Sequence, residues 1–229
     1  MKIKLYQPKN GYCYNSDTMF LYDFVSKFNI KGNVLEVGGG CGVLGLLIKR
    51  DFPKINLNII EKQEIMFEFI LNNLKENNLQ AEIFRGDFLE FDFNKKFDFI
   101  ISNPPFYNGT LKSNNDIKRI ARYEEFLPMS EFFTKVNKIL KERGEFIFCY
   151  DAKRIDDIIL KIPKPLKITD IRFFYPRINK DATLVLIRAK RHAKSEVKIH
   201  PPLIGFEGED FSKEANKIYK KANTKSIKI

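Results

Sequence analysis

The sequence predicts an α/β fold, built on a mostly parallel β-sheet with helices on both of its faces. Short apolar runs alternate with longer amphipathic segments along most of the chain, and this alternation is typical of parallel sheets. The chain has 229 residues, of which 44% are hydrophobic and 30% are charged. That composition is normal for a globular protein and excludes a disordered chain, and the length suits one domain.

Seven strands are expected, separated by helices over most of the chain. A glycine cluster ends the first strand, and an apolar second strand follows after one helix. The last two strands have no helical pattern between them, so we expect one antiparallel edge strand in an otherwise parallel sheet. The strands are expected at 33–37, 55–60, 81–85, 97–102, 145–150, 166–175 and 182–189, and the helices at 41–52, 64–75, 129–141 and 152–160.

Two regions are expected to lie outside this sheet, one at each end of the chain. Residues 1–30 form an N-terminal extension, and residues 191–229 form a tail that contains a predicted helix at 212–222. No internal repeat or linker divides the chain. The sequence therefore predicts a single domain over residues 1–229.

Positive charge is concentrated in the last third of the chain. The formal net charge is +11, and residues 161–229 alone hold 17 Lys and Arg against 7 Asp and Glu. A one-sided basic field favours a phosphate backbone as partner, because binding releases the counterions of the nucleic acid. The alternative is a lysine-rich surface that only solvates the protein. We predict a nucleic-acid partner, and we expect His192 and His200 at the surface of this region.

Several classes of protein are excluded by what the sequence lacks. No apolar run approaches the roughly 20 residues of a membrane span, and the first residues have no apolar signal core. Cys13, Cys41 and Cys149 are scattered and form no CxxC pair, which argues against a disulfide scaffold and against a zinc site. We expect a cytoplasmic protein, monomeric, without a metal.

A glycine-rich turn lies between the first strand and the first helix. Glu36, Gly38, Gly40 and Gly42 form an acidic residue followed by GxGxG. Glycines at this position let the backbone approach a ligand at the helix N-terminus, although a tight structural turn needs them as well. A competing GxGxxG pattern ends at Gly45, which would place its third glycine well inside the helix. We therefore favour the acidic pattern.

The next two strands also end in acidic residues. Glu61 ends the second strand, and Asp87 follows the third with Phe88 beside it. Each also has an ordinary structural explanation. Glu61 could be a residue of a helix first turn, where the helix dipole favours a negative charge, and Asp87 could be a turn residue beside Phe88 of the core. With Glu36, however, there are three carboxylates at the carboxyl ends of three successive strands, and separate structural explanations account for this repetition less well than one shared ligand. They predict an adenosine-containing ligand.

The fourth strand runs into Asn103, Pro104, Pro105 and Phe106. As a structural feature the two prolines break the chain, but the motif also lies where open α/β sheets hold their ligands. The Asn103 side-chain oxygen and the Pro104 carbonyl could accept both hydrogens of a planar exocyclic amine and aim its lone pair at an electrophilic methyl group. Phe106 could stack on an extruded base. This motif predicts amine methylation.

Together these motifs resemble the class I S-adenosylmethionine-dependent methyltransferases, specifically the amino-methylating branch. The resemblance implies a Rossmann-like fold with a seven-stranded sheet, and S-adenosyl-L-methionine as cofactor. By position it assigns the cofactor's methionine end to Glu36, the ribose hydroxyls to Glu61 and the adenine to Asp87. Asn103, Pro104 and Phe106 would take the target. Before the core, Ser16 and Asp17 either contact the cofactor or cap the helix that follows them.

More of the chain resembles the bacterial tRNA-valine adenine-N6 methyltransferases, which modify the adenosine beside the anticodon. The matching features are Gln7 with Gly11-Tyr12, then 15–17, 120–124 and Pro201-Pro202-Leu203. Gly39 departs from the pattern by crowding the glycine turn, and Tyr123 stands where histidine is expected. The resemblance implies tRNA, or another structured RNA, as partner.

A polar and basic loop at 107–123 is predicted to close over the target nucleotide, with an ordinary connection as the alternative. Other substrates remain open, because the Asn-Pro-Pro-Phe motif suits any planar amine. They are guanine N2 in ribosomal RNA, adenine N6 in DNA and a protein glutamine amide. An RNA-binding protein on a retired methyltransferase fold is the non-enzymatic alternative.

Overall fold

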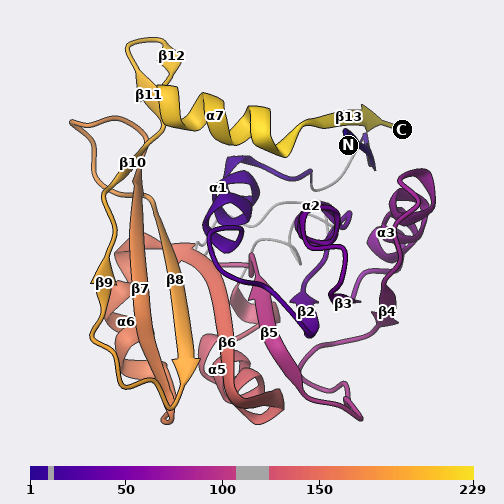
Figure 1. Ribbon diagram of the computed structural model, residues 1–229, viewed down its shortest axis with the longest axis horizontal. Coiled ribbons are helices and arrows are strands. Elements are labelled where there is room, and N and C mark those ends of the chain that lie inside the picture. Colours follow the sequence, from indigo (N-terminus) through magenta and orange to yellow (C-terminus); the bar gives the residue numbers. More distant parts are fainter. Residues whose placement is uncertain (10–12, 107–123) are drawn as a thin grey trace.

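The computed structural model describes residues 1–9, 13–106 and 124–229 and contains a central sheet of nine strands among them. The strands follow the order β10-β7-β8-β6-β5-β2-β3-β4, and β9 also pairs with β7 (Figure 1). The strands of this sheet are β2 Asn33–Val37, β3 Asn56–Glu61, β4 Glu82–Arg85, β5 Phe97–Ser102, β6 Leu140–Asp151, β7 Leu166–Tyr175, β8 Leu184–Arg191, β9 Lys198–Ile199 and β10 Leu203–Ile204. The α-helices among the described residues are α1 Ser16–Val25, α2 Val43–Asp51, α3 Glu64–Glu76, α5 Met129–Ile139, α6 Ile155–Lys161 and α7 Lys213–Ala222, with 3-10 turns at Glu124–Phe126 and Ala152–Arg154.

The predicted α/β class is confirmed, and two details of the sheet differ from the prediction. The sheet has nine strands where seven were expected, because β9 and β10 add to it. The antiparallel strand β8 does not lie at an edge. It pairs antiparallel with both β6 and β7, so the strand that follows β7 in the chain inserts between β7 and β6. The side chains of β8 alternate between the hydrophobic clusters on the two faces of the sheet, so its apolar run is buried on both faces.

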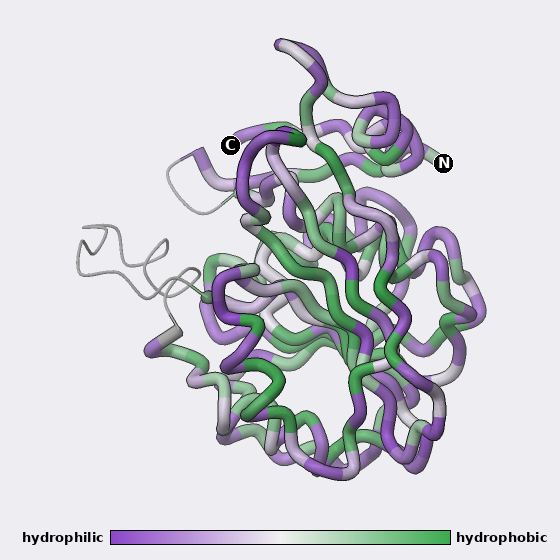
Figure 2. Tube along the Cα trace, turned by 90° about the vertical axis from the view of Figure 1, so that its left-hand side faces the viewer, coloured by the Kyte–Doolittle hydropathy of each residue, from purple (hydrophilic) through white to green (hydrophobic). Residues whose placement is uncertain are grey.

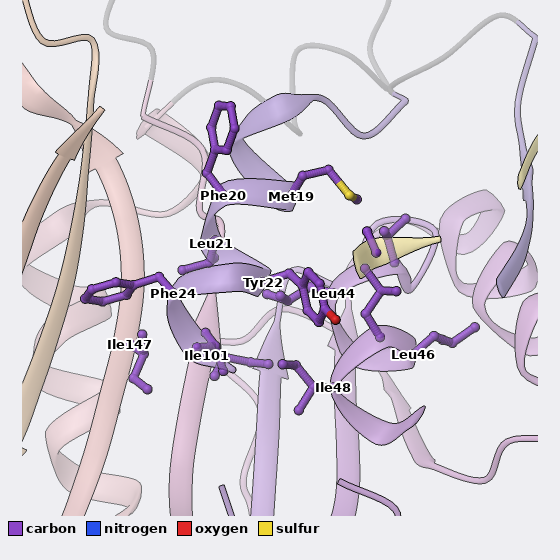
Figure 3. Packing of buried hydrophobic residues seen from close by; sticks show 14 of the residues in the cluster. Met19, Phe20, Leu21, Tyr22, Phe24, Leu44, Leu46, Ile48, Ile101 and Ile147 are labelled. Carbon is purple, nitrogen blue, oxygen red and sulfur yellow. The ribbon is translucent and has the colours of Figure 1, made fainter. Parts of the chain in front are cut away.

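Two hydrophobic clusters cover the two faces of the sheet. One joins the sheet to α1, α2 and α3, and the other joins it to α5 and α6. In Figure 3, α1 directs Phe24 toward Ile147 of β6, while Tyr22 of the same helix lies beside Leu44 of α2. Six successive residues of α2, from Val43 to Ile48, are buried, because α1 and β1 (Ile3–Gln7) also contact this helix.

The boundary between α5 and β6 differs from the prediction of a helix over 129–141. The helix ends at Ile139, and Leu140 already pairs with Phe97 at the start of β5. The segment then bulges, and Arg143 adopts a φ of 63° just before Gly144. Pairing with β5 therefore replaces the last helical residues that the sequence periodicity favours.

The tail is part of the fold, contrary to the prediction that it lies outside the sheet. Besides β9 and β10, it contains a small hairpin of β11 (Phe206–Glu207) and β12 (Asp210–Phe211), then α7. Its last strand, β13 (Thr224–Lys228), pairs in parallel with β1, so the two ends of the chain lie side by side (Figure 1). Figure 2 shows α7 as a largely hydrophilic helix above the hydrophobic strands of the sheet.

His200 was expected at the surface, but its side chain is only 18% exposed. Its Nε2 lies 2.8 Å from Asp170 Oδ1 on β7, and its ring meets Phe24 edge-on. The Pro201 carbonyl beside it accepts a hydrogen bond from Arg172 Nε at 2.9 Å. These contacts bind the start of the tail to the sheet edge. His192 is 53% exposed, as expected.

Candidate active site

The predicted site residues gather around two adjoining cavities at the carboxyl ends of β2, β3 and β5. The larger cavity encloses about 690 Å³, part of it open to solvent. Gly38, Gly40 and Asn103 belong to the walls of both cavities, so the two adjoin each other at these residues. The larger is lined by Val37, Gly38, Gly40, Ile60, Glu61, Lys62, Gln63, Met66, Gly86, Asp87, Phe88, Asn103, Pro105, Phe126 and Leu127, and the smaller by Tyr14, Thr18, Glu36, Gly38–Cys41, Val43, Leu44 and Asn103.

The glycine turn follows β2 and lies against the end of β3. Gly38, Gly40 and Gly42 have φ values of 72°, 54° and 83°, which a residue with a side chain rarely adopts. The N–H groups of Gly38 and Gly39 both donate to the Ile60 carbonyl. A Cβ on Gly39 would lie 2.4 Å from Ile59 Cγ2. The glycine that departs from the family pattern therefore allows the turn to lie against β3.

Glu36 lies under the first turn of α2 and is 3% exposed. Its Oε2 accepts a hydrogen bond from the Gly45 N–H at 2.9 Å, and a Cβ on Gly45 would lie 2.4 Å from the same oxygen. The pKa of Glu36 is raised to about 8, mainly by burial; the Gly45 hydrogen bond lowers it and the nearby Glu61 adds to the rise. Gly45, the third glycine of the competing GxGxxG pattern, leaves the space that this carboxyl group occupies.

Glu61 fixes the other side of the glycine turn. Its Oε2 accepts from the Gly40 N–H and its Oε1 from the Gln63 N–H, both at 2.8 Å. Burial raises the pKa of Glu61, while these backbone hydrogen bonds act in the opposite direction. The carboxylate is therefore held in one orientation on the wall of the larger cavity.

Asp87 and Phe88, in the turn after β4, line the larger cavity. Asp87 Oδ1 accepts from the Leu89 N–H at 2.8 Å, which holds the turn after β4, and Oδ2 pairs with Lys62 Nζ at 2.7 Å. The Phe88 ring is 5% exposed and presents an apolar surface beside the carboxylate. Such a pair suits a planar heterocycle with an amino group.

Asn103 lies where the two cavities meet, directly after β5. Its Nδ2 donates to Thr18 Oγ1 at 3.1 Å, and its Oδ1 accepts from Cys149 Sγ at 3.0 Å. Pro104 is buried, while Pro105 lines the larger cavity. The Phe106 ring lies 5.5 Å from the Tyr150 ring, at an angle of 47°. Stacking of Phe106 on a base stays a prediction.

The N-terminal extension supplies one wall of the smaller cavity. Ser16 and Asp17 begin α1 but are not among the described residues that line either cavity; Tyr14 and Thr18, which flank them, are. Asn15 is the helix N-cap and donates to Asp17 Oδ2 at 2.7 Å. Burial raises the pKa of Asp17. A role for Ser16 and Asp17 in cofactor binding stays a prediction.

The C-terminal tail holds this wall in place. The Tyr14 hydroxyl lies 3.1 Å from Thr224 Oγ1 of β13, and the Tyr14 N–H donates to the Gln7 side chain of β1. The sequence singled out neither Tyr14 nor Thr18, nor Phe126 and Leu127 of the larger cavity. Their only local signal is nearness to motifs on either side, because they reach the site through tertiary packing.

Some predicted features lie outside the described residues. These are Gly11-Tyr12, the loop at 107–123 and the part of the 120–124 motif within it. Within the described ranges, no group of histidine, cysteine or acidic side chains is arranged to hold a metal ion. None of the helices described is both long enough and apolar enough to cross a membrane.

Comparison with known proteins identifies the family. The sequence profile of the methyltransferase small domain matches residues 15–156. The chain is 37% identical over 91 residues to ribosomal RNA small subunit methyltransferase C of Haemophilus influenzae, which covers 40% of this chain and 27% of that protein. It is 27% identical over 139 residues to the tRNA1(Val) (adenine(37)-N6)-methyltransferase of Porphyromonas gingivalis, which covers 58% of this chain and 54% of that protein. These matches thus span between about a quarter and about half of the relatives' length.

Solved structures share the fold. One described as a predicted O-methyltransferase, from Agrobacterium tumefaciens, has a TM-score of 0.70 at 16% identity and covers 93% of this chain and 100% of its own. The Thermus thermophilus 16S rRNA N2 G1207 methyltransferase, in complex with AdoMet and guanosine, has a TM-score of 0.57 at 19% identity and covers 80% of this chain and 45% of its own. The fold is that of the class I methyltransferases, and the chain belongs to the methyltransferase small domain family.

Proposed function

We propose that this chain is an S-adenosyl-L-methionine-dependent methyltransferase of an exocyclic amino group in RNA, with adenine N6 in tRNA as the leading substrate. The observation that carries the proposal is the position of Asn103. Its amide lies at the junction of the two cavities, at the end of a central parallel strand, and is followed by the Pro104 carbonyl.

The walls of the two cavities fit the methyl donor. Glu61 and Asp87 offer carboxylate oxygens for ribose hydroxyls and an adenine amine, and Phe88 offers an apolar face for the ring. Glu36 lies on the smaller cavity, where the methionine end would bind; a cationic ammonium group there would favour the ionised form of this buried carboxyl. When bound, S-adenosyl-L-methionine supplies an electrophilic methyl group on a sulfonium centre.

The proposed reaction does not require a strong general base from the protein. The Asn103 oxygen and the Pro104 carbonyl would accept the two hydrogens of the target amine. These hydrogen bonds localise the lone pair that is otherwise delocalised into the base, and they orient it for in-line attack. Because the donor is already a good electrophile, positioning and electrostatics carry the catalysis, and no strong base is needed.

RNA is favoured by the charge of the tail. Lys213, Lys217 and Lys220 of α7 and Lys225 and Lys228 of β13 are exposed. Helix α7 lies above α1, whose N-terminal end borders the smaller cavity (Figure 1). The hairpin β11–β12, in contrast, exposes the acidic residues Glu207, Glu209 and Asp210. We therefore place the phosphate-binding surface on α7 and β13 rather than on the whole tail.

The names of the relatives support RNA and leave two bases in competition. The tRNA relative favours adenine N6 beside the anticodon of a valine tRNA. The shorter, more identical match to a ribosomal RNA methyltransferase, together with the similar solved structure of a 16S rRNA N2 G1207 methyltransferase, makes guanine N2 the second candidate. Both are exocyclic amines, which is the group that Asn103 suits. We further propose that the chain acts as a cytoplasmic monomer and folds as one domain, with loop 107–123 contributing to RNA binding.

Methyl transfer from labelled S-adenosyl-L-methionine to total tRNA, total rRNA, genomic DNA and cell protein, run in parallel and followed by nucleoside analysis, tests this proposal. N6-methyladenosine only in tRNA is the expected result, and N2-methylguanosine in rRNA would select the second candidate. The matched variant is Asn103→Ala, which should abolish transfer while cofactor affinity stays within about twofold. Label only in protein, or loss of cofactor binding in Asn103→Ala, would refute the assignment.

A further inference from the structure

The Asn103 amide is held from two sides by groups that the substrate chemistry does not use. Thr18 Oγ1, on α1, accepts from Asn103 Nδ2 at 3.1 Å, and Cys149 Sγ, on β6, donates to Asn103 Oδ1 at 3.0 Å. Thr18 is 6% exposed and Cys149 is fully buried. The two partners come from elements that are far apart in the sequence and that the fold brings to opposite sides of one side chain.

The orientation of this amide decides whether the proposed chemistry works. An asparagine side chain presents an acceptor on one side and two donors on the other. Rotated by half a turn, Asn103 would direct its NH₂ at the target amine, and two donors would face each other. In the structure Nδ2 donates to the Thr18 hydroxyl and Oδ1 accepts from the Cys149 thiol, whereas the rotated amide would set its NH₂ against the thiol sulfur, which is a weak acceptor. Because Oδ1 has two lone pairs, it can accept from Cys149 and from the target together.

We infer that Thr18 and Cys149 are positioning residues, which hold the Asn103 amide with its oxygen available to the target amine. This inference rests on the proposed function. In this role both residues act through the Asn103 amide and not on the target amine themselves.

The surroundings of Cys149 support a hydrogen-bonding role over simple packing. Its neighbours Phe146, Ile147, Phe148 and Tyr150 fill the same buried stretch of β6, so an aliphatic residue would pack there equally well. Burial, and next the nearby Asp17, hold the pKa of the Cys149 thiol well above its usual range. The thiol therefore keeps its proton and remains a donor. Thr18 likewise lies on the cavity wall, where α1 packs against the core.

Four variants separate hydrogen bonding from packing. Cys149→Ala and Thr18→Val remove the partner, while Thr18→Ser keeps the hydroxyl and Cys149→Ser replaces the thiol by a hydroxyl that can still donate. With the RNA that accepts most label, we expect kcat to fall about five- to tenfold in Cys149→Ala and Thr18→Val. The dissociation constant for S-adenosyl-L-methionine, measured by calorimetry, should stay within about twofold. The two serine variants should recover at least half of the lost rate. Ile147→Val, which trims the same face of β6 without touching Asn103, should leave kcat unchanged.

A further measurement distinguishes positioning from loss of stability. Nuclear magnetic resonance of the Asn103 side-chain NH₂ should show faster proton exchange in Thr18→Val than in Thr18→Ser, a readout that needs no activity. Equal losses in Cys149→Ala and Cys149→Ser, or wild-type rates in both Cys149→Ala and Thr18→Val, would overturn the inference. A wild-type protein without any methyl transfer would instead overturn the proposed function.

Discussion

Replacing Gly45 by alanine tests how closely α2 packs on Glu36. In an ordinary helix interior this change stabilises a protein by about 1 kcal/mol, because alanine has the higher helix propensity. Here the new Cβ would lie 2.4 Å from Glu36 Oε2 and 3.2 Å from Ile59 Cδ1. The Glu36 side chain would have to move, and it would lose its hydrogen bond from the Gly45 N–H.

The expected magnitude follows from these opposing contributions. Overpacking costs roughly 1–3 kcal/mol and the lost hydrogen bond about 1 kcal/mol, against the gain of about 1 kcal/mol from helix propensity. We therefore expect Gly45→Ala to lower the free energy of unfolding by about 2 kcal/mol, which is roughly 4–8 °C in Tm for a chain of this size. Urea denaturation measures the stability. Calorimetry with S-adenosyl-L-methionine should show weaker binding, since Glu36 is displaced.

The matched control is the same substitution in a Glu36→Ala background. Without the carboxyl group, the atoms nearest to the Cβ added at position 45 are those of the Ile59 and Leu57 side chains, at 3.2 and 3.4 Å. Gly45→Ala should then be neutral or stabilising by up to about 1 kcal/mol. Stabilisation by Gly45→Ala in the wild-type background, or an equal cost in both backgrounds, would refute the reasoning.

Three further predictions follow from the site. Because the pKa of Glu36 rises from 4.5 to about 8 on folding, mainly through burial, the folded chain keeps a proton that the unfolded chain releases between these pH values. The free energy of unfolding should therefore fall by roughly 3–5 kcal/mol as pH rises from 4.5 to 8. Urea denaturation should show a shallower fall with pH in Glu36→Gln, and an equal fall in both proteins would contradict the assignment to Glu36. Asp87→Asn keeps an acceptor for the Leu89 N–H but offers an amide to the adenine, so cofactor affinity should drop about tenfold at nearly unchanged Tm; unchanged calorimetric affinity would exclude the adenine contact. Replacing Lys217 and Lys220 by Glu should weaken RNA binding and reduce the slope of the logarithm of the RNA-binding constant against the logarithm of salt concentration by about 2 or more. The control replaces Lys31 and Lys54, at the amino ends of β2 and β3, by Glu and should leave this slope unchanged.

Local sequence patterns predicted most of the central sheet, and they placed the candidate site residues at the carboxyl ends of its strands. The seven predicted strands correspond to β2 through β8, since each is a buried apolar run bounded by turn residues. Glu36, Glu61, Asp87 and Asn103 follow or end such runs, and parallel strands bring their carboxyl ends to one edge. The structure places all four on the walls of adjoining cavities. Their roles toward cofactor and substrate stay predictions.

The order of the strands and the tail could not be predicted in the same way. The place of β8 between β6 and β7 depends on pairing partners, and β9 and β10 have two residues each, too few for a periodic pattern. Strand β1 pairs with β13 from the opposite end of the chain.

The sequence by itself determined the fold class, the glycine turn and the residues at the strand ends, because periodicity and chain breaks are properties of neighbouring residues. Only the tertiary structure decided that Tyr14 and Thr18 form a cavity wall, that Gly45 makes room for Glu36, and that Cys149 meets Asn103. Contacts of this kind join residues from separate elements. They depend on how the helices and strands pack together, which no local pattern records.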